Sequence, residues 1–313
     1  MAAPAAAELS ELLEEVRLIE IQSRRLVAGV MAGGYGSVFR GRGIEFDEVR
    51  EYVEGDDPRS VDWNVTARVG RPFVKKYVDE RELTVLFLLD LSGSMTGGFG
   101  PWSARQMAAR ICACLALSAL KNHDKVGLIA FSDAVDRYVP AKKGIGHALR
   151  VVRDCLALPG SSARTRLAPA LDFAGRVLRR RAILFLVSDF LDGSPGPERG
   201  RPGWSHALTL CARRHDVIAV RLLTPELEPP APAMMRIRDP ERSRETVVDW
   251  RSPRVRAAYE QRVARWRAGT ADELSRARVD RMDVVVPRHP DRNAVARPIL
   301  RFFRMRELRG AKR

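Results

Sequence analysis

An aspartate and two serines follow directly on a long apolar run, and their types and spacing suggest chemistry. In TVLFLLDLSGSM, residues 84–95, the run ends at Asp90, and Ser92 and Ser94 follow at alternate positions. Such a run is typical of a strand covered on both faces, and the turn after it can aim all three side chains at one point. Three kinds of chemistry use such a group: nucleophilic hydrolysis, phosphoryl transfer through an aspartate, and binding of a hard cation.

A second acid occupies the same kind of position. Asp189 ends another buried-strand pattern, AILFLVSD, residues 182–189. Ligand sites of open α/β sheets lie at the carboxyl ends of the strands, so we expect Asp90 and Asp189 at one edge of one sheet. Carboxylate and hydroxyl oxygens suit Mg²⁺ or Mn²⁺, with a coordination position left open. The pattern therefore predicts a metal site; the alternative is that Asp90 caps the next helix and the serines shape the turn.

The other two chemistries lack their usual partners in this sequence. A serine hydrolase elbow has the pattern G-x-S-x-G, and neither serine has a glycine two residues before it. The five histidines show no motif spacing, and an aspartyl-phosphate enzyme usually has a second acid where this chain has Ser92. There is no phosphate-binding G-x-x-x-x-G-K-[ST] loop, no H-E-x-x-H and no cysteine cluster for zinc. Nothing in the sequence indicates catalysis, so we predict a protein that is not an enzyme.

Length and composition describe a globular chain with room for one large or two ordinary domains. The 313 residues are 45% hydrophobic and 30% charged. No stretch approaches the roughly 18 apolar residues that span a bilayer, and the first residues lack the pattern of a secretion signal. We therefore expect no transmembrane segment and a cytoplasmic location. A reducing compartment also suits the four cysteines, which we predict to be buried thiols: Cys112, Cys114, Cys155 and Cys211.

Positive charge is concentrated towards the end of the chain. Residues 236–313, the basic C-terminal region, hold 22 Lys and Arg against 11 Asp and Glu, so most of the net charge of +15 lies there. Such a surface could bind nucleic acid or an anionic surface, which is the alternative function. Arginine outnumbers lysine along the whole chain, which favours ordinary solvated faces instead. We expect no sequence-specific nucleic-acid binding, because no recognition motif is present.

The elements that must position the two acids follow an alternating order. Strand patterns separated by helical patterns from Leu83 to about Leu223 predict a mainly parallel sheet with helices on both faces. Residues 224–250 interrupt this order and predict a hairpin that pairs MMRIRD with ETVVDW. A long helix from Pro253 to about Ser275, a strand at 280–286 and a final helix complete the pattern. Upstream, residues 8–28 have helical spacing and PFVKKYV, residues 72–78, is a strand pattern.

These motifs together resemble a von Willebrand factor A-like domain, which has a Rossmann-like α/β fold. In that family D-x-S-x-S after the first strand begins a metal-ion-dependent adhesion site, here Asp90, Ser92 and Ser94. The family's later threonine matches Thr165 in SSARTRLAPAL, and its later aspartate matches Asp189. The resemblance thus implies five ligands for Mg²⁺ or Mn²⁺ and a position that accepts an acidic side chain from a protein partner. The threonine loop departs from the family pattern, because arginines flank Thr165 where glycines and an acid are common.

A longer block is similar to a narrower bacterial family, called domain of unknown function fifty-eight. The block runs from GRGIEFDEVREYVEGDDPRSVDWNVTARVGRPFVKKYVDE to the DLSGSM turn, and VDWRSPRVRAAYEQRV and RPILRFFRMR resemble its C-terminal part. This resemblance implies a non-enzymatic adaptor that works with a MoxR-type AAA+ ATPase in assembling or remodelling other proteins. It also implies three parts: an N-terminal segment, 1–80; a von Willebrand factor A-like domain, 81–305, with the hairpin inserted; and a basic tail, 306–313.

The segment EYVEGDDPRSVDWNVTAR, residues 51–68, has two interpretations. Its acids, arginines and tryptophan could form an interaction surface. Alternatively the segment is a structural turn, in which Asp62 pairs with Arg68 and Trp63 is buried against the sheet. We predict the second arrangement.

Overall fold

The computed structural model describes residues 45–53, 56, 60–78, 83–161, 163–196, 200–241, 244–291 and 293–310. They belong to two compact units, one within Gly36–Glu82 and one that begins at Leu83. The boundary predicted from the sequence falls after residue 80. The helix predicted for residues 8–28 lies outside the described residues.

The smaller unit is a two-stranded sheet with one short helix. Strand β1, Glu45–Glu51, pairs antiparallel with β2, Phe73–Val78, and α4, Trp63–Val69, lies between them in sequence. The strand predicted at PFVKKYV is therefore confirmed. The hydroxyl of Thr66 on α4 accepts a hydrogen bond from the Phe73 N–H, which ties the helix to the start of β2.

Asp62 caps a helix, a role that the predicted pairing with Arg68 did not include, and Trp63 is not buried as predicted. The Asp62 carboxylate accepts hydrogen bonds from the backbone N–H groups of Asn64 and Val65 and so caps α4. Trp63 is 72% exposed, so the prediction that it is buried is wrong. A two-stranded sheet offers too little area to cover even a seven-residue helix, and no side chain of α4 is buried.

The larger unit is built on a six-stranded sheet in the order β10-β7-β6-β3-β4-β5. All neighbouring pairs are parallel except β4 and β5, so β5 is an antiparallel edge strand. The mainly parallel sheet predicted from the alternating pattern is confirmed. The strands are β3 Thr84–Asp90, β4 Lys125–Phe131, β5 Val135–Lys142, β6 Ile183–Ser188, β7 Asp216–Leu223 and β10 Asp280–Val285.

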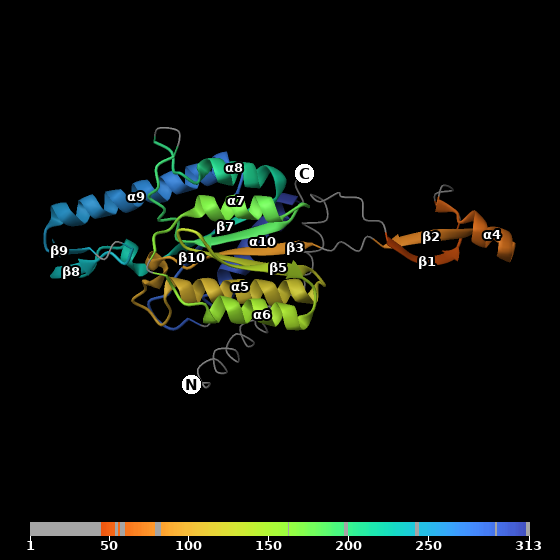
Figure 1. The fold of residues 1–313 in the computed structure, drawn as a ribbon, viewed down its shortest axis with the longest axis horizontal. Coiled ribbons are helices and arrows are strands. Elements are labelled where there is room, and N and C mark those ends of the chain that lie inside the picture. Colours follow the sequence, from red (N-terminus) through yellow and green to blue (C-terminus); the bar gives the residue numbers. More distant parts are fainter. Residues whose placement is uncertain are drawn as a thin grey trace. The chain divides into compact units, whose positions relative to one another are not determined.

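Helices cover both faces of this sheet (Figure 1). Helices α7, α8 and α9 lie on one face and α5, α6 and α10 on the other. Side chains alternate along a strand, so Leu86 and Leu88 face the first group, whereas Phe87 points the other way and stacks on Phe185 with ring centroids 5.6 Å apart. The helices are α5 Ala104–Lys121, α6 Ile145–Ala157, α7 Leu167–Val177, α8 Ser205–Arg214, α9 Pro253–Arg276 and α10 Ala296–Gly310.

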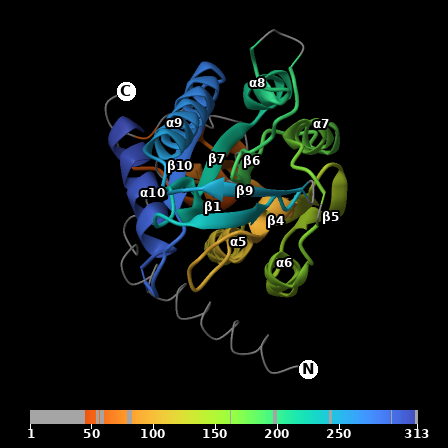
Figure 2. The same ribbon diagram turned by 90° about the vertical axis from the view of Figure 1, so that its left-hand side faces the viewer.

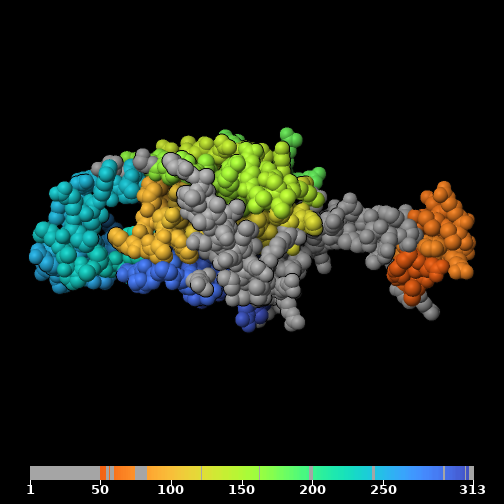
Figure 3. Space-filling model, turned by 90° about the horizontal axis from the view of Figure 1, so that it is seen from below, coloured from red at the N-terminus to blue at the C-terminus, as the bar shows by residue number. Residues whose placement is uncertain are grey.

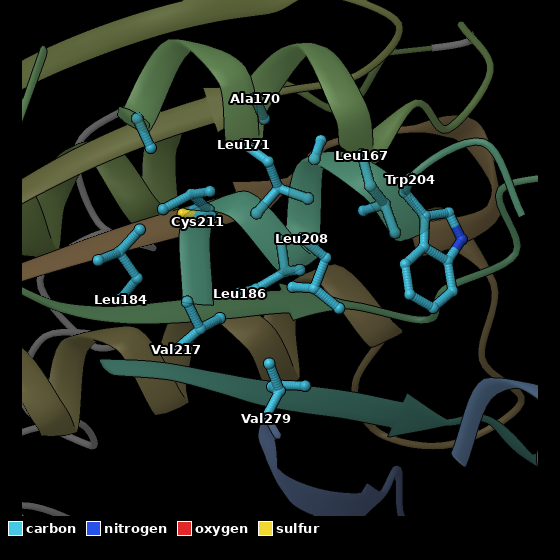
Figure 4. Close-up of a cluster of buried hydrophobic side chains, with 14 of the residues drawn as sticks. Leu167, Ala170, Leu171, Leu184, Leu186, Trp204, Leu208, Cys211, Val217 and Val279 are labelled. Carbon is cyan, nitrogen blue, oxygen red and sulfur yellow. The ribbon is translucent and has the colours of Figure 1, made fainter. Parts of the chain in front are cut away.

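A continuous apolar core joins α7 and α8 to the sheet. Figure 4 shows Leu167 and Leu171 of α7 facing Leu208 of α8 and Leu186 of β6. Truncating one such leucine to alanine costs about 2–5 kcal/mol, because a cavity remains where the side chain was. This packing fixes the ends of β6 and α7, which carry candidate ligands. The four cysteines are buried and free, as predicted.

The predicted hairpin is present. Strand β8, Met234–Arg238, pairs antiparallel with β9, Glu245–Asp249. At its base Trp250 is buried and packs edge to face on Tyr259 of α9, with ring centroids 5.1 Å apart. In Figure 2 the hairpin crosses in front of the sheet, at the edge where the parallel strands end.

Helix α10 is the last part of the chain that the structure describes. Helix α10 continues to Gly310, so residues 306–310, which the sequence places in a basic tail, are helical. Within the described part of the chain, no helix is both long and apolar enough to cross a membrane.

Candidate metal site at the carboxyl edge of the sheet

The strands that follow β3 in sequence lie on both sides of it in the sheet. From β3 the chain passes through α5 to β4 on one side, whereas β6 lies on the other side of β3. Asp90 is the last residue of β3, and Asp189 follows β6 directly. The crevice at such a switch point is where open α/β sheets bind ligands. Both acids therefore leave the sheet at its usual ligand-binding position.

Asp90 is fully buried and held through both oxygens. Its Oδ1 accepts a hydrogen bond from the Ser92 N–H at 2.9 Å, and its Oδ2 accepts one from the Ser188 hydroxyl at 2.5 Å. Ser188 ends β6 and precedes Asp189, so one strand end supplies both an acid and a hydroxyl. The sequence analysis missed Ser188, although its place beside Asp189 in VSDF was a signal.

The three predicted hydroxyl ligands lie together. The Thr165 Oγ1 atom is 2.8 Å from Ser92 Oγ, and Ser94 Oγ is 3.3 Å from each of them. The Thr165 loop is joined to the other turn by a hydrogen bond from the Gly93 N–H to the Ala163 carbonyl, 3.1 Å long. These contacts place side chains more than 70 positions apart in sequence within one small volume.

Asp192 anchors the start of the helix that follows Thr165. Its Oδ2 accepts a hydrogen bond from the Leu167 N–H at 2.9 Å, which caps α7 from another segment of the chain. The local cap position is Arg166, whose side chain forms no capping bond. Asp192 therefore ties the loop after β6 to the loop that carries Thr165. Sequence reasoning missed this residue, because its partner is distant in sequence.

Asp189 leaves the strand at a strained turn. Its Oδ1 accepts a hydrogen bond from the Leu191 N–H at 2.9 Å. Phe190 between them has φ 60, a left-handed conformation that is unusual for an aromatic residue. Two contacts stabilise this conformation. The buried Phe190 ring packs against Trp204, and the Trp266 indole N–H donates a hydrogen bond to the Phe190 carbonyl. The turn fixes the direction of Asp189.

The two carboxylates are electrostatically unfavourable neighbours. Burial, followed by the nearby charge of Asp189, raises the pKa of Asp90 to about 7. Burial is also the main reason that the pKa of Asp189 is raised, to about 6, while a hydrogen bond from Ser94 opposes the shift. Among the described residues, no lysine or arginine forms an ion pair with either acid. A cation between them would remove this penalty.

The donor set fits a hard divalent cation. It consists of two carboxylates and three hydroxyls, all oxygen, which suits Mg²⁺ or Mn²⁺. The described residues contain no group of three or more His, Cys, Asp or Glu side chains arranged to hold a metal ion. Neutral hydroxyls would thus supply much of the coordination, and a nitrogen- or sulfur-rich zinc site has no counterpart in this part of the chain.

One further acid reaches this site from the hairpin. The Glu241 Oε1 atom accepts hydrogen bonds from the Thr165 hydroxyl at 2.7 Å and from the Thr165 N–H at 3.3 Å. The sequence analysis placed Glu241 in a hairpin turn and gave it no role. No local pattern could have shown the contact, because it depends on how the hairpin lies on the sheet edge.

The basic C-terminal region has a different character. Its two adjacent aromatic residues, Phe302 and Phe303 of α10, are buried, so they are not exposed for stacking on bases. Many of its arginines are paired with acids; Arg306 contacts both Asp216 and Asp280 at 3.0 Å. Other pairs join Arg276 to Glu273, Arg288 to Glu228, Arg297 to Asp291 and Arg309 to Asp280.

An open, mainly parallel sheet with D-x-S-x-S after β3, the first of its strands in chain order, and helices on both faces defines a von Willebrand factor A-like α/β protein. The chain belongs to the family described as "Protein of unknown function DUF58", whose model matches residues 48–269. Uncharacterized proteins of Mycobacterium tuberculosis and Mycobacterium bovis are 31% identical over 217 residues, 69% of this chain. The chain spans 66% of the length of these relatives.

Solved structures with a similar fold have low sequence identity. The conserved hypothetical protein BatB from Bacteroides thetaiotaomicron is 16% identical with a TM-score of 0.45, over 72% of this chain and 99% of that chain. A von Willebrand factor type A protein from Catenulispora acidiphila is 15% identical with a TM-score of 0.41, over 75% of this chain and 43% of that one. These likenesses concern the fold alone.

Proposed function

We propose that the protein is a non-enzymatic interaction module with a metal-ion-dependent adhesion site. Asp90, Ser92, Ser94, Thr165 and Asp189 would hold Mg²⁺ or Mn²⁺, and an acidic side chain of a protein partner would complete the coordination. The observation that carries the proposal is the pair of buried carboxylates that has no cationic partner among the described residues and lies beside three converging hydroxyls. Buried charges are normally paired or bound to metal.

The surroundings of the hydroxyls support a binding role over catalysis. Within the described residues, the hydroxyls of Ser92, Ser94 and Thr165 hydrogen-bond to one another and to carboxylates. No histidine or lysine in that part of the chain hydrogen-bonds to them. The carboxylates that do include Glu241 and a candidate metal ligand, Asp189, which suits binding of a cation. What the cation supplies is a positive centre that an acidic group can approach.

A cation that binds the folded state raises thermal stability by mass action. Calorimetry should therefore show Mg²⁺ or Mn²⁺ raising the unfolding temperature of the wild type, and Asp90→Ala should abolish that rise while the protein still folds. Asp154→Asn is the matched control, because Asp154 is also a buried acid but has arginine neighbours, the nearest at 3.4 Å. This control should keep the metal-dependent rise. If the wild type binds neither ion, the proposal is wrong.

The partner we propose is a MoxR-type AAA+ ATPase, following the family resemblance. The ATPase needs Mg²⁺ for its nucleotide, so the comparison must be made between variants at one Mg²⁺ concentration. A purified MoxR-type ATPase should bind the wild type and Asp154→Asn alike, and should bind Asp90→Ala at least about tenfold more weakly, because a charge-assisted contact is lost. Equal binding by all three proteins would separate the ATPase from the metal site.

A further inference from the structure

The tip of the hairpin, of which residues 239–241 and 244 are described, contacts the candidate metal site through the side chain of Glu241. Thr165 has a single hydroxyl proton, and an ionised carboxylate can only accept, so the 2.7 Å contact directs that proton to Glu241. The Thr165 oxygen then accepts from Ser92 or Ser94, at 2.8 and 3.3 Å. Glu241 therefore orients one of the candidate ligands and places a carboxylate directly beside it.

The backbone of the tip lies close to the turn that carries Ser92 and Ser94. A Cβ added at Gly93 would lie 2.9 Å from the Pro240 carbonyl oxygen, so the absence of a side chain there allows the hairpin to approach. The tip is also ordered internally, because Asp239 accepts the Glu241 N–H at 2.9 Å. In Figure 3 the hairpin, in cyan, abuts the gold surface formed by the chain after β3.

Apart from its tip and base the hairpin is poorly packed. Met234 and Val247 are each 60% exposed, and no residue of β8 or β9 is buried. The base is held by Trp250 against α9, as described above. In the described part of the hairpin, the Glu241 contact is therefore a main attachment of the tip to the sheet edge.

We infer that the hairpin is a latch: Glu241 is the chain's own acidic occupant at the mouth of the metal site, and a partner's acidic group has to displace it. The inference rests on the proposed function for the identity of the site, but the contact itself does not need a metal. A cation would attract Glu241 as it attracts a partner's carboxylate, so the two compete on the same chemistry. The latch would therefore tune how readily a partner reaches the site.

The test compares Glu241→Ala with Glu245→Ala, which removes the same side chain from the start of β9, where Glu245 contacts only Arg236 at 3.7 Å in the described residues. Hydrogen exchange without metal should become about tenfold faster in residues 234–249 for Glu241→Ala, because a charge-assisted contact is lost. Water-proton relaxation by bound Mn²⁺ should also rise, because the opened tip admits solvent. Glu245→Ala should change neither measurement.

A second variant displaces the tip without removing the acid. Gly93→Ala places a methyl group against the Pro240 carbonyl and should speed exchange of the same residues. Unchanged exchange in both Glu241→Ala and Gly93→Ala would overturn the latch. A wild type that takes up no Mn²⁺ would instead count against the proposed function, and the exchange measurement, made without metal, would still decide whether the latch exists.

Discussion

The carboxyl edge of the sheet and the basic C-terminal region, residues 236–313, both concentrate charge, but they accommodate it differently. At the sheet edge, Asp90 and Asp189 are buried and share hydrogen bonds with hydroxyls and backbone N–H groups, without an ion pair among the described residues. In the basic region, several arginines form ion pairs with acids, within one helix or on another segment of the chain. The first arrangement leaves two buried acids without a cation, whereas in the second the arginines named above are paired with acids of the same fold.

Whether a charged side chain has a partner of opposite charge indicates whether it is available to bind a ligand or serves to join two elements. A buried acid without a cation is costly, and a fold retains it where an added ligand offsets the cost. An arginine paired with an acid mostly joins two elements, as Arg306 joins α10 to β7 and β10 through Asp216 and Asp280. Net charge alone, which is highest in the last quarter of the chain, therefore does not distinguish arginines that join elements from buried acids that could bind a ligand.

The largest expected effect comes from breaking a buried ion pair that joins β7 to the basic region. Arg221 on β7 is only 4% exposed, and Asp283 on β10 holds it through two hydrogen bonds of 2.9 and 3.0 Å. Asp283→Ala leaves the buried guanidinium with a lost partner and should lower the free energy of unfolding by about 2–4 kcal/mol in urea titrations. The Arg267 carbonyl, which also accepts from Arg221, limits the loss.

The control for that variant is an exposed pair in the same region. Arg309, 66% exposed in its side chain, contacts Asp280 at 3.1 Å, and Arg309→Ala should cost less than about 0.5 kcal/mol. Equal losses for the two variants would show that burial does not set the value of these pairs, and the contrast between the two regions would lose its basis.

A smaller effect of opposite sign is expected at the sheet edge. At pH 7 and without metal, Asp189→Asn should raise the free energy of unfolding by about 1–2 kcal/mol, because it removes one of two buried, repelling charges. An asparagine oxygen can still accept the Leu191 N–H. In Mg²⁺ the order should reverse, since the wild type gains stability from the ion and the variant does not. Chemical denaturation with EDTA and with Mg²⁺ measures both.

Asp154→Asn, the buried acid with arginine neighbours, makes the same substitution where the charge is balanced. It should lose stability in both conditions. A stabilised Asp154→Asn, or a destabilised metal-free Asp189→Asn, would contradict the idea that the sheet edge alone carries unbalanced charge.

The sequence predicts features that depend on neighbouring residues better than contacts between residues far apart in the chain. The strands, the hairpin and the convergence of Asp90, Ser92, Ser94, Thr165 and Asp189 rest on local periodicity, the strand ends and the family motif, all of which the sequence contains. The Ser188 contact to Asp90 spans 98 positions, and the Glu241 contact to Thr165 spans 76. Such contacts depend on how loops lie across the folded edge, which no local pattern specifies. Trp63 shows the same limit, because its exposure depends on how little sheet surrounds α4.

The smallest effect is expected for nucleic acid, where the comparison predicts almost none. Arginines already paired with acids have fewer counterions to release, so they add little to phosphate binding, and the buried Phe302 and Phe303 offer no surface for stacking. Binding to duplex DNA should therefore be weak, show no sequence preference and disappear near physiological salt. Fluorescence anisotropy with two unrelated duplexes over a salt series measures all three properties. A shallow slope with no preference fits arginines that serve the fold. Tight, sequence-selective binding at physiological salt would mean that this region binds DNA as its own ligand. The protein would then have a second function beside the proposed adaptor role.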